Sequence, residues 1–506
     1  MDKTNLIELE EAVNSSNNDS ITKEKLSNTD DSMIHWQEEY AYTLGTQAYI
    51  CAYSWLYFAQ LRYDWISKEK PDDYQGGVDM AYNQFYHYTK LVDPKSQAGG
   101  TPNNDTLYSL CFLDLNKEPI VFSHPYIADR YFSFELASMT SDNFGYIGQR
   151  TTGGMAGETT ENILGKTING SGVFLIAGPN WDGHLPKGVR SCDIIRFPAQ
   201  SNGTKLMNLP ATSPTRYAFG LIRTEVRDGD VEKVNDIQKQ YTLTPLSQWV
   251  NEIEPRPENR EVWAPYDRKV DTLADWKTIN NFMIDNPCLA QNKELFSLFE
   301  QIGIGPGSNV DNLDDITKNG LERAAVEGRR LIHAMGKAGA FCNNINGWSF
   351  PPETMGSAGY YGDFPTRGII QCAEGMISND PQEAVYPNTS VDSKGKPLDC
   401  SQKYTMTFKA GELPDVKAFW SLTVYDSNNK LVVGSTNYCI TSLNPTYEME
   451  PDGSLILYIQ AENPAGKDTN WLQAPSDTGF LMVLRAYLPG EDIINQKWEI
   501  PGLVKQ

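Results

Sequence analysis

Between residues 105 and 225 the chain alternates between short runs of β-branched and aromatic residues and clusters of Gly, Pro, Asn and Asp. Short strands separated by turns, with no helical pattern between them, are typical of antiparallel sheets that pack face to face. A similar pattern returns from about residue 348. The sequence therefore predicts two β-sandwiches. The expected strands are "LYSLCFLDL", "PIVFS", "RYFSFELASM", "GVFLIAG", "CDIIRF" and "YAFGLIRTEV" in the first, and "YTMTF", "AFWSLTVYD", "SLILYIQ" and "FLMVLRAYL" in the second.

Two other segments have a helical pattern. The stretch "AYICAYSWLYFA" (48–59) is apolar on nearly every face and too short to cross a bilayer, so it predicts a helix buried in the core. In "LERAAVEGRRLIHAMGKAGAF" (321–341), apolar and small residues recur at the i, i+3, i+4 spacing of an amphipathic helix.

The expected fold class is mainly β with α, in a chain whose 506 residues are enough for two or three domains. In order, we expect a disordered acidic arm (1–34), a helical N-terminal segment (35–100), a first β-sandwich (101–228), a helical domain (229–347) and a second β-sandwich (348–506).

The net charge of the chain limits the classes of partner that it can bind. A net charge of −22 disfavours binding to nucleic acid or to an anionic membrane, since both require a basic face. No signal peptide is visible, and the eight cysteines show no CxxC spacing, so we expect a cytoplasmic protein with free thiols. We expect a small-molecule ligand or substrate. The sequence leaves open a homo-oligomer and, since its acidic loops are rich in oxygen ligands, a Ca²⁺ ion; no other cofactor is expected.

Common catalytic motifs are missing. The five histidines form no HExxH or other short pair, which disfavours a zinc hydrolase, and no GxSxG nucleophile elbow occurs. The cluster "DNLDD" (311–315) lacks the spacing of a calcium-binding EF-hand loop and is better interpreted as a solvated helix start.

What remains are clusters of amides and carboxylates beside aromatic rings. Asn and Asp are routine turn formers, so each cluster by itself is best explained as structural. Together they offer what a pocket for a polar ligand needs: amides, a carboxylate, a guanidinium and stacking rings. The clusters are "PNNDT" with Asn103, Asn104 and Asp105, followed by Tyr108; "SDNFGYIGQR" with Asp142 and Arg150; "GYYGDFPTRG" with Tyr361, Asp363 and Arg367; and "DTNWLQAP" with Trp471.

These motifs resemble a bacterial two-domain family made of the domains of unknown function 1254 (N-terminal) and 1214 (C-terminal). The similarity runs from about residue 38 to 505, through "TPNNDTLYS", "DRYFSFELASMTSDNFGYIGQRTTGG", "NGWSFPPE", "YYGDFPTRG", "AFWSLTVYD" and "LRAYLPGED". It implies an immunoglobulin-like sandwich, a helical insertion and a C-terminal jelly-roll-like sandwich. It implies no activity. One departure is "STNYCITS", where the family usually has an Arg just before the Tyr.

Two functions remain open. The first is an enzyme of hydrolase or lyase type acting on a small polar or carbohydrate-like molecule, with a carboxylate whose pKa is raised by burial as acid or base. Its expected catalytic residues are Asp105, Tyr108 and Asp363, and its expected substrate-binding residues are Asn103, Asn104, Asp142, Arg150, Tyr361, Arg367, Trp420 and Trp471. The second is a non-catalytic binding or assembly module. An enzyme should bring three or more of these groups together in one concave site, whereas a module should leave them scattered on turns.

Overall fold

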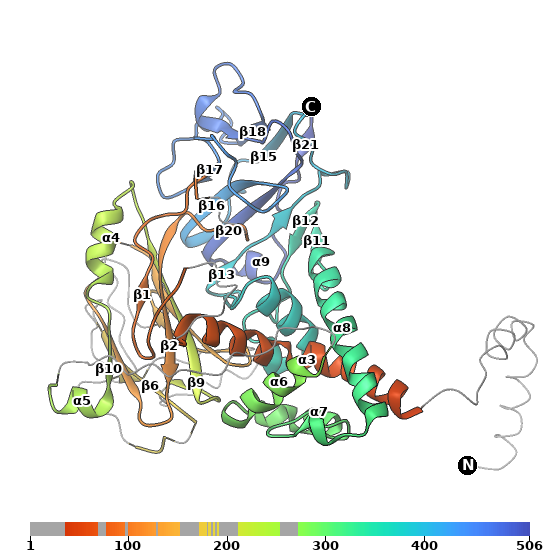
Figure 1. Ribbon diagram of the computed structural model, residues 1–506. Coiled ribbons are helices and arrows are strands. Elements are labelled where there is room, and N and C mark those ends of the chain that lie inside the picture. The colour runs from red at the N-terminus through yellow and green to blue at the C-terminus, as the bar shows by residue number, and fades with distance from the viewer. Residues whose placement is uncertain are drawn as a thin grey trace, which may run out of the picture.

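The computed structural model describes residues 36–68, 77–96, 100–127, 130–151, 172–179, 181–183, 186–187, 190–191, 211–253 and 272–506. They form a helical layer and two β-rich units, and the C-terminal β-rich unit lies above the other two parts in the view of Figure 1. The predicted acidic arm and the predicted strand "CDIIRF" lie outside the described residues. No helix in the described ranges combines the length and the apolar character that a membrane span requires.

The helical layer is built around α3 (Trp36–Ile66), whose side chains are buried on most sides, as the sequence predicted. The helix α8 (Asp315–Lys337) packs along α3. Close approach requires a glycine at the crossing, because a Cβ at Gly328 would lie only 2.7 Å from the Tyr49 side chain. Asp314 caps α8 by accepting a hydrogen bond from the Thr317 N–H at 2.9 Å, so the "DNLDD" cluster is a helix start.

Shorter helices complete the layer. They are α6 (Ala274–Asp285), η1 (Ala290–Asn292), α7 (Lys293–Glu300), η2 (Val310–Asn312), η3 (Ala358–Tyr361) and the π-helix η4 (Thr366–Ala373). Of these, α6, α7 and η4 contact α3 directly.

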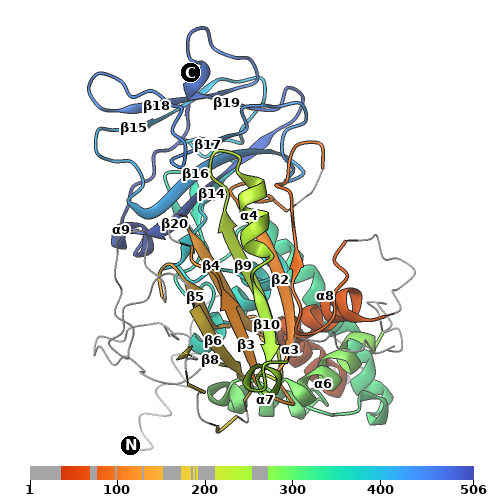
Figure 2. The same ribbon diagram turned by 90° about the vertical axis from the view of Figure 1, so that its left-hand side faces the viewer.

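The N-terminal β-rich unit consists of two sheets with an apolar core between them. The first sheet has the order β1-β2-β9-β4-β5, which Figure 2 shows in part, and the second has the order β10-β3-β6-β7 with β8 beside β6. Its strands are β1 (Tyr86–His87), β2 (Thr106–Asp114), β3 (Ile120–His124), β4 (Phe132–Ser138), β5 (Asn143–Gly148), β6 (Gly172–Ala177), β7 (Arg190–Ser191), β8 (Ala211–Thr212), β9 (Tyr217–Glu225) and β10 (Thr242–Pro245). Phe122 and Phe134 meet in this core at 4.6 Å between ring centroids. Two short helices, α4 (Val231–Gln238) and α5 (Leu246–Val250), flank it.

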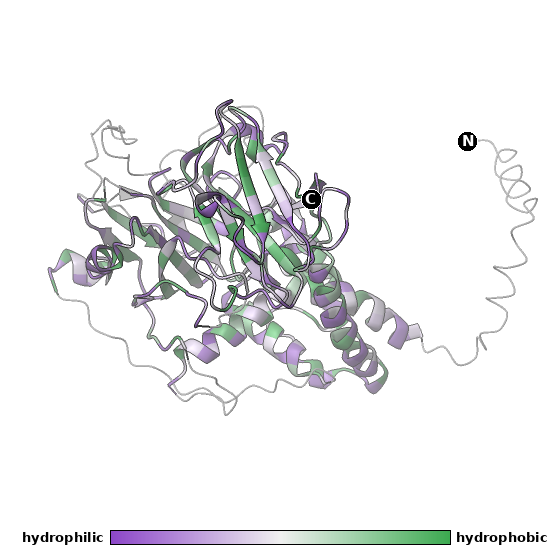
Figure 3. Cartoon of the chain, turned by 90° about the horizontal axis from the view of Figure 1, so that it is seen from above, coloured by the Kyte–Doolittle hydropathy of each residue, from purple (hydrophilic) through white to green (hydrophobic). Residues whose placement is uncertain are grey.

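The C-terminal β-rich unit also pairs two sheets. One has the order β11-β12-β14-β20-β16-β17 with β13 on β20, and the other has the order β19-β18-β15-β21. The strands are β11 (Asn343–Ile345), β12 (Trp348–Phe350), β13 (Ala384–Val385), β14 (Asn388–Thr389), β15 (Tyr404–Phe408), β16 (Val416–Asp426), β17 (Cys439–Thr441), β18 (Leu455–Gln460), β19 (Trp471–Gln473), β20 (Phe480–Pro489) and β21 (Val504–Lys505). The helices are η5 (Asp468–Asn470) and α9 (Glu491–Ile494). Met406, Leu457 and Leu484 are fully buried between the sheets. In Figure 3 the strands are mostly in hydrophobic colours, whereas solvent-facing helix surfaces are mostly hydrophilic.

The fold class predicted from the sequence is confirmed: the protein is mainly β with several helices, and its sheets are mostly antiparallel. The expected strands that fall on described residues are present. Several strands were not expected, β5 and β10 among them. β5 lies in the cluster interpreted as a polar site, and β10 lies in the segment 229–347 predicted to be helical, where it pairs with β3. The immunoglobulin-like and jelly-roll-like assignments stay predictions.

Candidate functional site

A cleft of about 490 Å³ lies where the two β-rich units and the helical layer meet. The N-terminal unit contributes Tyr108 and Arg223, and the C-terminal unit contributes Val483 and Arg485. The end of α8 near Gly336 forms a further side. The volume is within the range of about 300–1,000 Å³ typical of small-molecule sites.

The floor of the cleft is one end of the first sheet of the N-terminal unit. Side chains alternate along a strand, so Tyr108 and Phe112 of β2 lie on the same face, as do Arg223 and Phe219 of β9. On that face, Phe112 and Phe219 pack into the apolar cluster formed with α3. Tyr108, Arg223 and Ser133 stand opposite one another on three adjacent strands. The end of the face with this row therefore carries polar side chains.

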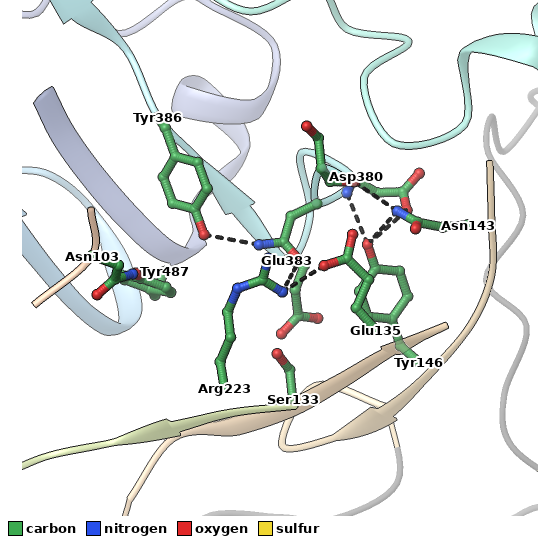
Figure 4. Close-up of polar contacts among 12 residues, drawn as sticks. Asn103, Ser133, Glu135, Asn143, Tyr146, Arg223, Asp380, Glu383, Tyr386 and Tyr487 are labelled. Carbon is green, nitrogen blue, oxygen red and sulfur yellow. Dashed lines mark hydrogen bonds and ion pairs between the residues drawn. The ribbon is translucent and has the colours of Figure 1, made fainter. Parts of the chain in front are cut away.

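A chain of hydrogen bonds crosses the cleft floor (Figure 4). Arg223 Nη1 donates to Glu135 Oε2 at 2.5 Å and to Asn379 Oδ1 at 3.2 Å. Asn379 Nδ2 in turn donates to the Tyr386 hydroxyl oxygen at 2.8 Å. Burial raises the pKa of Glu135, against the lowering effect of Arg223. Burial also raises the pKa of Tyr386 to about 12, so its hydroxyl is protonated at neutral pH.

The opposite wall is the outer face of β20. Its residues alternate between two environments, with Met482, Leu484 and Ala486 in the core of the C-terminal unit and Leu481, Val483, Arg485 and Tyr487 on the other face. Arg485 is only 4% exposed. It donates to the Thr101 carbonyl at 2.8 Å and to the Thr423 hydroxyl at 3.5 Å, and lies 5.7 Å from the Tyr425 ring centroid.

A connecting segment, residues 379–386, fastens the C-terminal unit to the N-terminal sheet. Asp380 Oδ2 accepts a hydrogen bond from the Tyr146 hydroxyl at 2.9 Å, and Glu383 Oε2 forms an ion pair with Arg150 Nε at 2.5 Å. Figure 4 shows Asp380 and Glu383 approaching the N-terminal sheet. Arg150, predicted to bind substrate, therefore anchors this segment, which places Asn379 and Tyr386 at the cleft.

The stretch "PNNDT" is a turn that also joins the two units. Asn103 Oδ1 accepts the Asp105 N–H at 2.7 Å, which is an Asx turn, and Asn103 Nδ2 donates to the Tyr487 hydroxyl at 2.5 Å. Asp105 is buried and accepts a hydrogen bond from the Ser421 hydroxyl at 2.6 Å. Burial raises the pKa of Asp105, against the lowering effects of Arg485 and Ser421. Asn103 lines the cleft, whereas Asp105 and Asn104 are not among its lining residues.

Asp142 and Arg367, both predicted to bind substrate, form an ion pair beneath the surface. Both side chains are 0% exposed, and Arg367 Nη1 lies 3.4 Å from Asp142 Oδ2. Asp142 Oδ1 also accepts the Gly359 N–H at 2.6 Å, and Arg367 Nη2 donates to the Cys51 carbonyl at 2.5 Å. The pair ties the N-terminal unit to the helical layer and does not line the cleft.

Asp363 and Tyr361 lie elsewhere in the helical layer. Asp363 accepts hydrogen bonds from the Thr354 hydroxyl at 2.6 Å and from the Thr366 N–H at 3.2 Å, at the start of η4. The Tyr361 side chain is among the exposed large side chains, at 37%. Neither residue lines the cleft.

The two tryptophans predicted to stack on substrate belong to the C-terminal unit. Trp420 is 2% exposed and stacks on Tyr447 at 5.7 Å, inside the core between the two sheets. Its neighbour Ser421 faces the N-terminal unit, because successive side chains point to opposite faces. Trp471 donates from its indole nitrogen to the Gln460 carbonyl at 2.9 Å.

Of the residues predicted from the sequence, Asn103 and Tyr108 line the cleft. The roles given to all of them stay predictions. Sequence reasoning missed Arg223, Arg485 and Tyr386, and also Glu135 beneath the floor. For three of them a signal was available, since Glu135, Arg223 and Arg485 are charged residues inside otherwise apolar strand runs. A charged residue in a buried strand requires a partner, which a search for turn clusters does not detect.

Fold and site define a class: a two-unit β-sheet protein with a polar cleft at the junction of its units. Residues 82–245 match the family described as protein of unknown function DUF1254, and residues 383–491 match the family described as protein of unknown function DUF1214. The chain therefore belongs to the two-domain family in which DUF1254 precedes DUF1214. The resemblance expected from the motifs is confirmed.

One solved structure supports the same fold. The chain is similar to the VPA0106 protein from Vibrio parahaemolyticus, with 21% identity and a TM-score of 0.64 over 92% of this chain and 100% of the other. A putative uncharacterized protein from Burkholderia cenocepacia matches with 12% identity and a TM-score of 0.41 over 90% of this chain and 86% of the other. No curated protein matches the chain.

Proposed function

We propose that the protein binds a small polar molecule in the cleft between its two β-rich units. The observation that carries this proposal is the convergence of Arg223, Asn379 and Tyr386 with Arg485 on one cavity of about 490 Å³. These groups come from three distant parts of the chain. Pockets with a few placed polar groups and an otherwise apolar lining are the usual sites for small ligands.

The chemistry of the lining favours a ligand with hydrogen-bond acceptors. The two guanidinium groups and the Asn103 and Asn379 side chains offer N–H donors, and the Tyr108 and Tyr386 hydroxyls offer O–H donors. No group of three or more His, Cys, Asp or Glu side chains within the described ranges is arranged to hold a metal ion.

A second candidate is catalysis of hydrolase or lyase type in the same cleft, with a tyrosine as the acid. The specific observation is the Tyr386 hydroxyl. Its oxygen accepts a hydrogen bond from Asn379, and among the described residues no acceptor is recorded for its own proton. With its pKa raised to about 12, this hydroxyl would donate a proton to a leaving group and would not act as a base at neutral pH.

The test is a thermal-shift screen across sugars, organic acids, amines and polyols, followed by calorimetry on the hits. Tyr386→Phe removes one hydroxyl from the cleft, and Tyr361→Phe makes the same change at an exposed position outside it. We expect a hit to lose at least about tenfold in affinity in Tyr386→Phe, the equivalent of about 1.4 kcal/mol, and to bind Tyr361→Phe normally. Hits whose affinity is the same in both variants would show that the cleft is not the binding site. Turnover of a hit that is lost in Tyr386→Phe would favour the catalytic candidate.

A further inference from the structure

Arg485 differs from the other fully buried arginines among the described residues. Arg130 pairs with Asp230 at 2.7 Å, Arg223 with Glu135 at 2.5 Å, and Arg367 with Asp142 at 3.4 Å. Arg485 is 4% exposed, yet within the described part of the chain it forms no ion pair with a carboxylate. A buried guanidinium cannot lose its proton, so it requires an anion or a full set of acceptors.

The acceptors that the protein supplies to Arg485 are few. The recorded hydrogen bonds go to the Thr101 carbonyl, the Thr423 hydroxyl and the Tyr425 hydroxyl, and all three acceptors are uncharged. Asp105 acts on Arg485 through its charge, but it lies beyond ion-pair distance, and its Oδ2 accepts the Ser421 hydroxyl. Since Arg485 lines the cleft, a bound anion has access to it. A planar guanidinium matches a carboxylate with two parallel hydrogen bonds.

The other charged residues of the lining do not require a second anion. Lys337 and Glu374 carry opposite charges, which cancel in the net charge of the lining. Arg223 already forms a short ion pair with Glu135, and its other recorded acceptor is Asn379. A ligand with two negative charges would therefore place the second charge near a neutralised arginine. The charge balance of the described lining fits a ligand with a single acidic group.

Much of the remaining lining is apolar. The aliphatic and thioether side chains that line the cleft include Met355, Ile370, Ile377, Val385, Leu481 and Val483. Two of them, Leu481 and Val483, precede Arg485 on the same face of β20. An apolar group next to the acidic one would contact these side chains, and its removal from water would contribute to binding.

We propose that the ligand of this cleft is an organic monocarboxylate with an apolar body, whose carboxylate binds Arg485. The proposal rests on the proposed function of the cleft and specifies the class of ligand.

The test compares matched acids and amides on the full chain by calorimetry at pH 7 and fixed ionic strength. The probes are hexanoate and phenylacetate, their amides, the dicarboxylate adipate, and acetate. We expect at least one of the two longer monocarboxylates to bind, and to bind at least tenfold more tightly than its amide, adipate or acetate. Equal binding of acid and amide, or tighter binding of adipate, would overturn the proposal. This comparison uses the unmodified protein, so it does not depend on the folding of any variant.

Substitutions test whether Arg485 is the residue that binds the carboxylate of the ligand. Arg485→Gln should lose at least tenfold in affinity for the acid and leave any binding of the amide unchanged. Arg323→Gln is a matched control, because Arg323 pairs with Glu38 and Glu39 outside the cleft. A folded Arg485→Gln protein that binds the acid normally would overturn the proposal. If no acid binds but another polar molecule binds in a Tyr386-dependent way, the ligand class is wrong and the proposed function stands. If no molecule of either panel binds in a Tyr386-dependent way, both the ligand class and the proposed function are wrong.

Discussion

Replacing Asp142 by Asn tests whether the Asp142–Arg367 pair holds the structure together. The substitution is nearly isosteric and keeps Oδ1, which accepts the Gly359 N–H at 2.6 Å. It places an NH₂ group where Oδ2 accepted the Thr140 hydroxyl at 2.7 Å and faced Arg367 at 3.4 Å. Donor then faces donor, and Arg367 keeps a charge without its carboxylate.

The expected cost follows from burial. Both side chains of the pair are 0% exposed, so solvent does not screen the lost charge. Removing one partner of a buried ion pair typically costs about 3–5 kcal/mol of unfolding free energy. In a cooperative unit of 150–250 residues, each kcal/mol of lost unfolding free energy lowers Tm by about 2–4 °C. The expected drop in Tm is therefore roughly 6–20 °C. Arg367→Met should cost less, since the remaining Asp142 can take up a proton, whereas an unpaired arginine cannot lose one.

The assay is urea unfolding followed by tryptophan fluorescence, supported by calorimetric Tm values. Asp236→Asn is the matched control, because Asp236 pairs with Lys239 on the surface and both side chains are 72% exposed. We expect no measurable change in that control. A loss below about 1 kcal/mol in Asp142→Asn, the range of exposed pairs, would refute the reasoning. It would show that Asp142 already carries a proton in the folded protein.

Two further predictions concern groups that the sequence singled out. Because burial raises the folded-state pKa of Asp105 above 3.8, its ionisation destabilises the fold as the pH rises from 3.8 through that raised pKa. Asp105→Asn should therefore gain in Tm relative to the unmodified protein between pH 4 and 7.5, and a relative loss over that range would contradict burial as the dominant influence on this carboxyl. The seven cysteines among the described residues are free, and Cys192 lies outside them. We expect eight titratable thiols in denaturant without reductant, and six or fewer would contradict the prediction. In the native protein Cys51 should react slowly with thiol reagents, because burial raises its thiol pKa to about 11.

Local pattern was enough to place the longer strands other than β5, and the two longest helices, whereas most of the short strands were missed. In β20, a short and nearly continuous apolar run indicated a buried strand, and in α8 the i, i+3, i+4 stripe indicated the side that packs on α3. The strand β5 (Asn143–Gly148) was missed because Asn and two glycines have low strand propensity. Its pairing with β4 and the burial of its side chains override that propensity.

The candidate site followed from the sequence only in part, and the register of strands explains why. Asn103 and Tyr108 were found because they stand in a turn cluster that borders the cleft. Trp420 was assigned to the site, yet its neighbour Ser421 faces the N-terminal unit, and a one-residue difference in register decides which of the two does so.

The amino-acid sequence by itself determined the periodicity of the longer elements, the negative net charge and the family to which the chain belongs. Only the tertiary structure decided that Arg223 is paired with Glu135, that Arg485 is not paired with a carboxylate among the described residues, and that both line one cleft. Whether a buried charge is compensated depends on which segments pack beside it. Distant segments pack together by burying apolar surface, as Tyr131 does against Tyr487, and local sequence carries no information about a partner so far away along the chain.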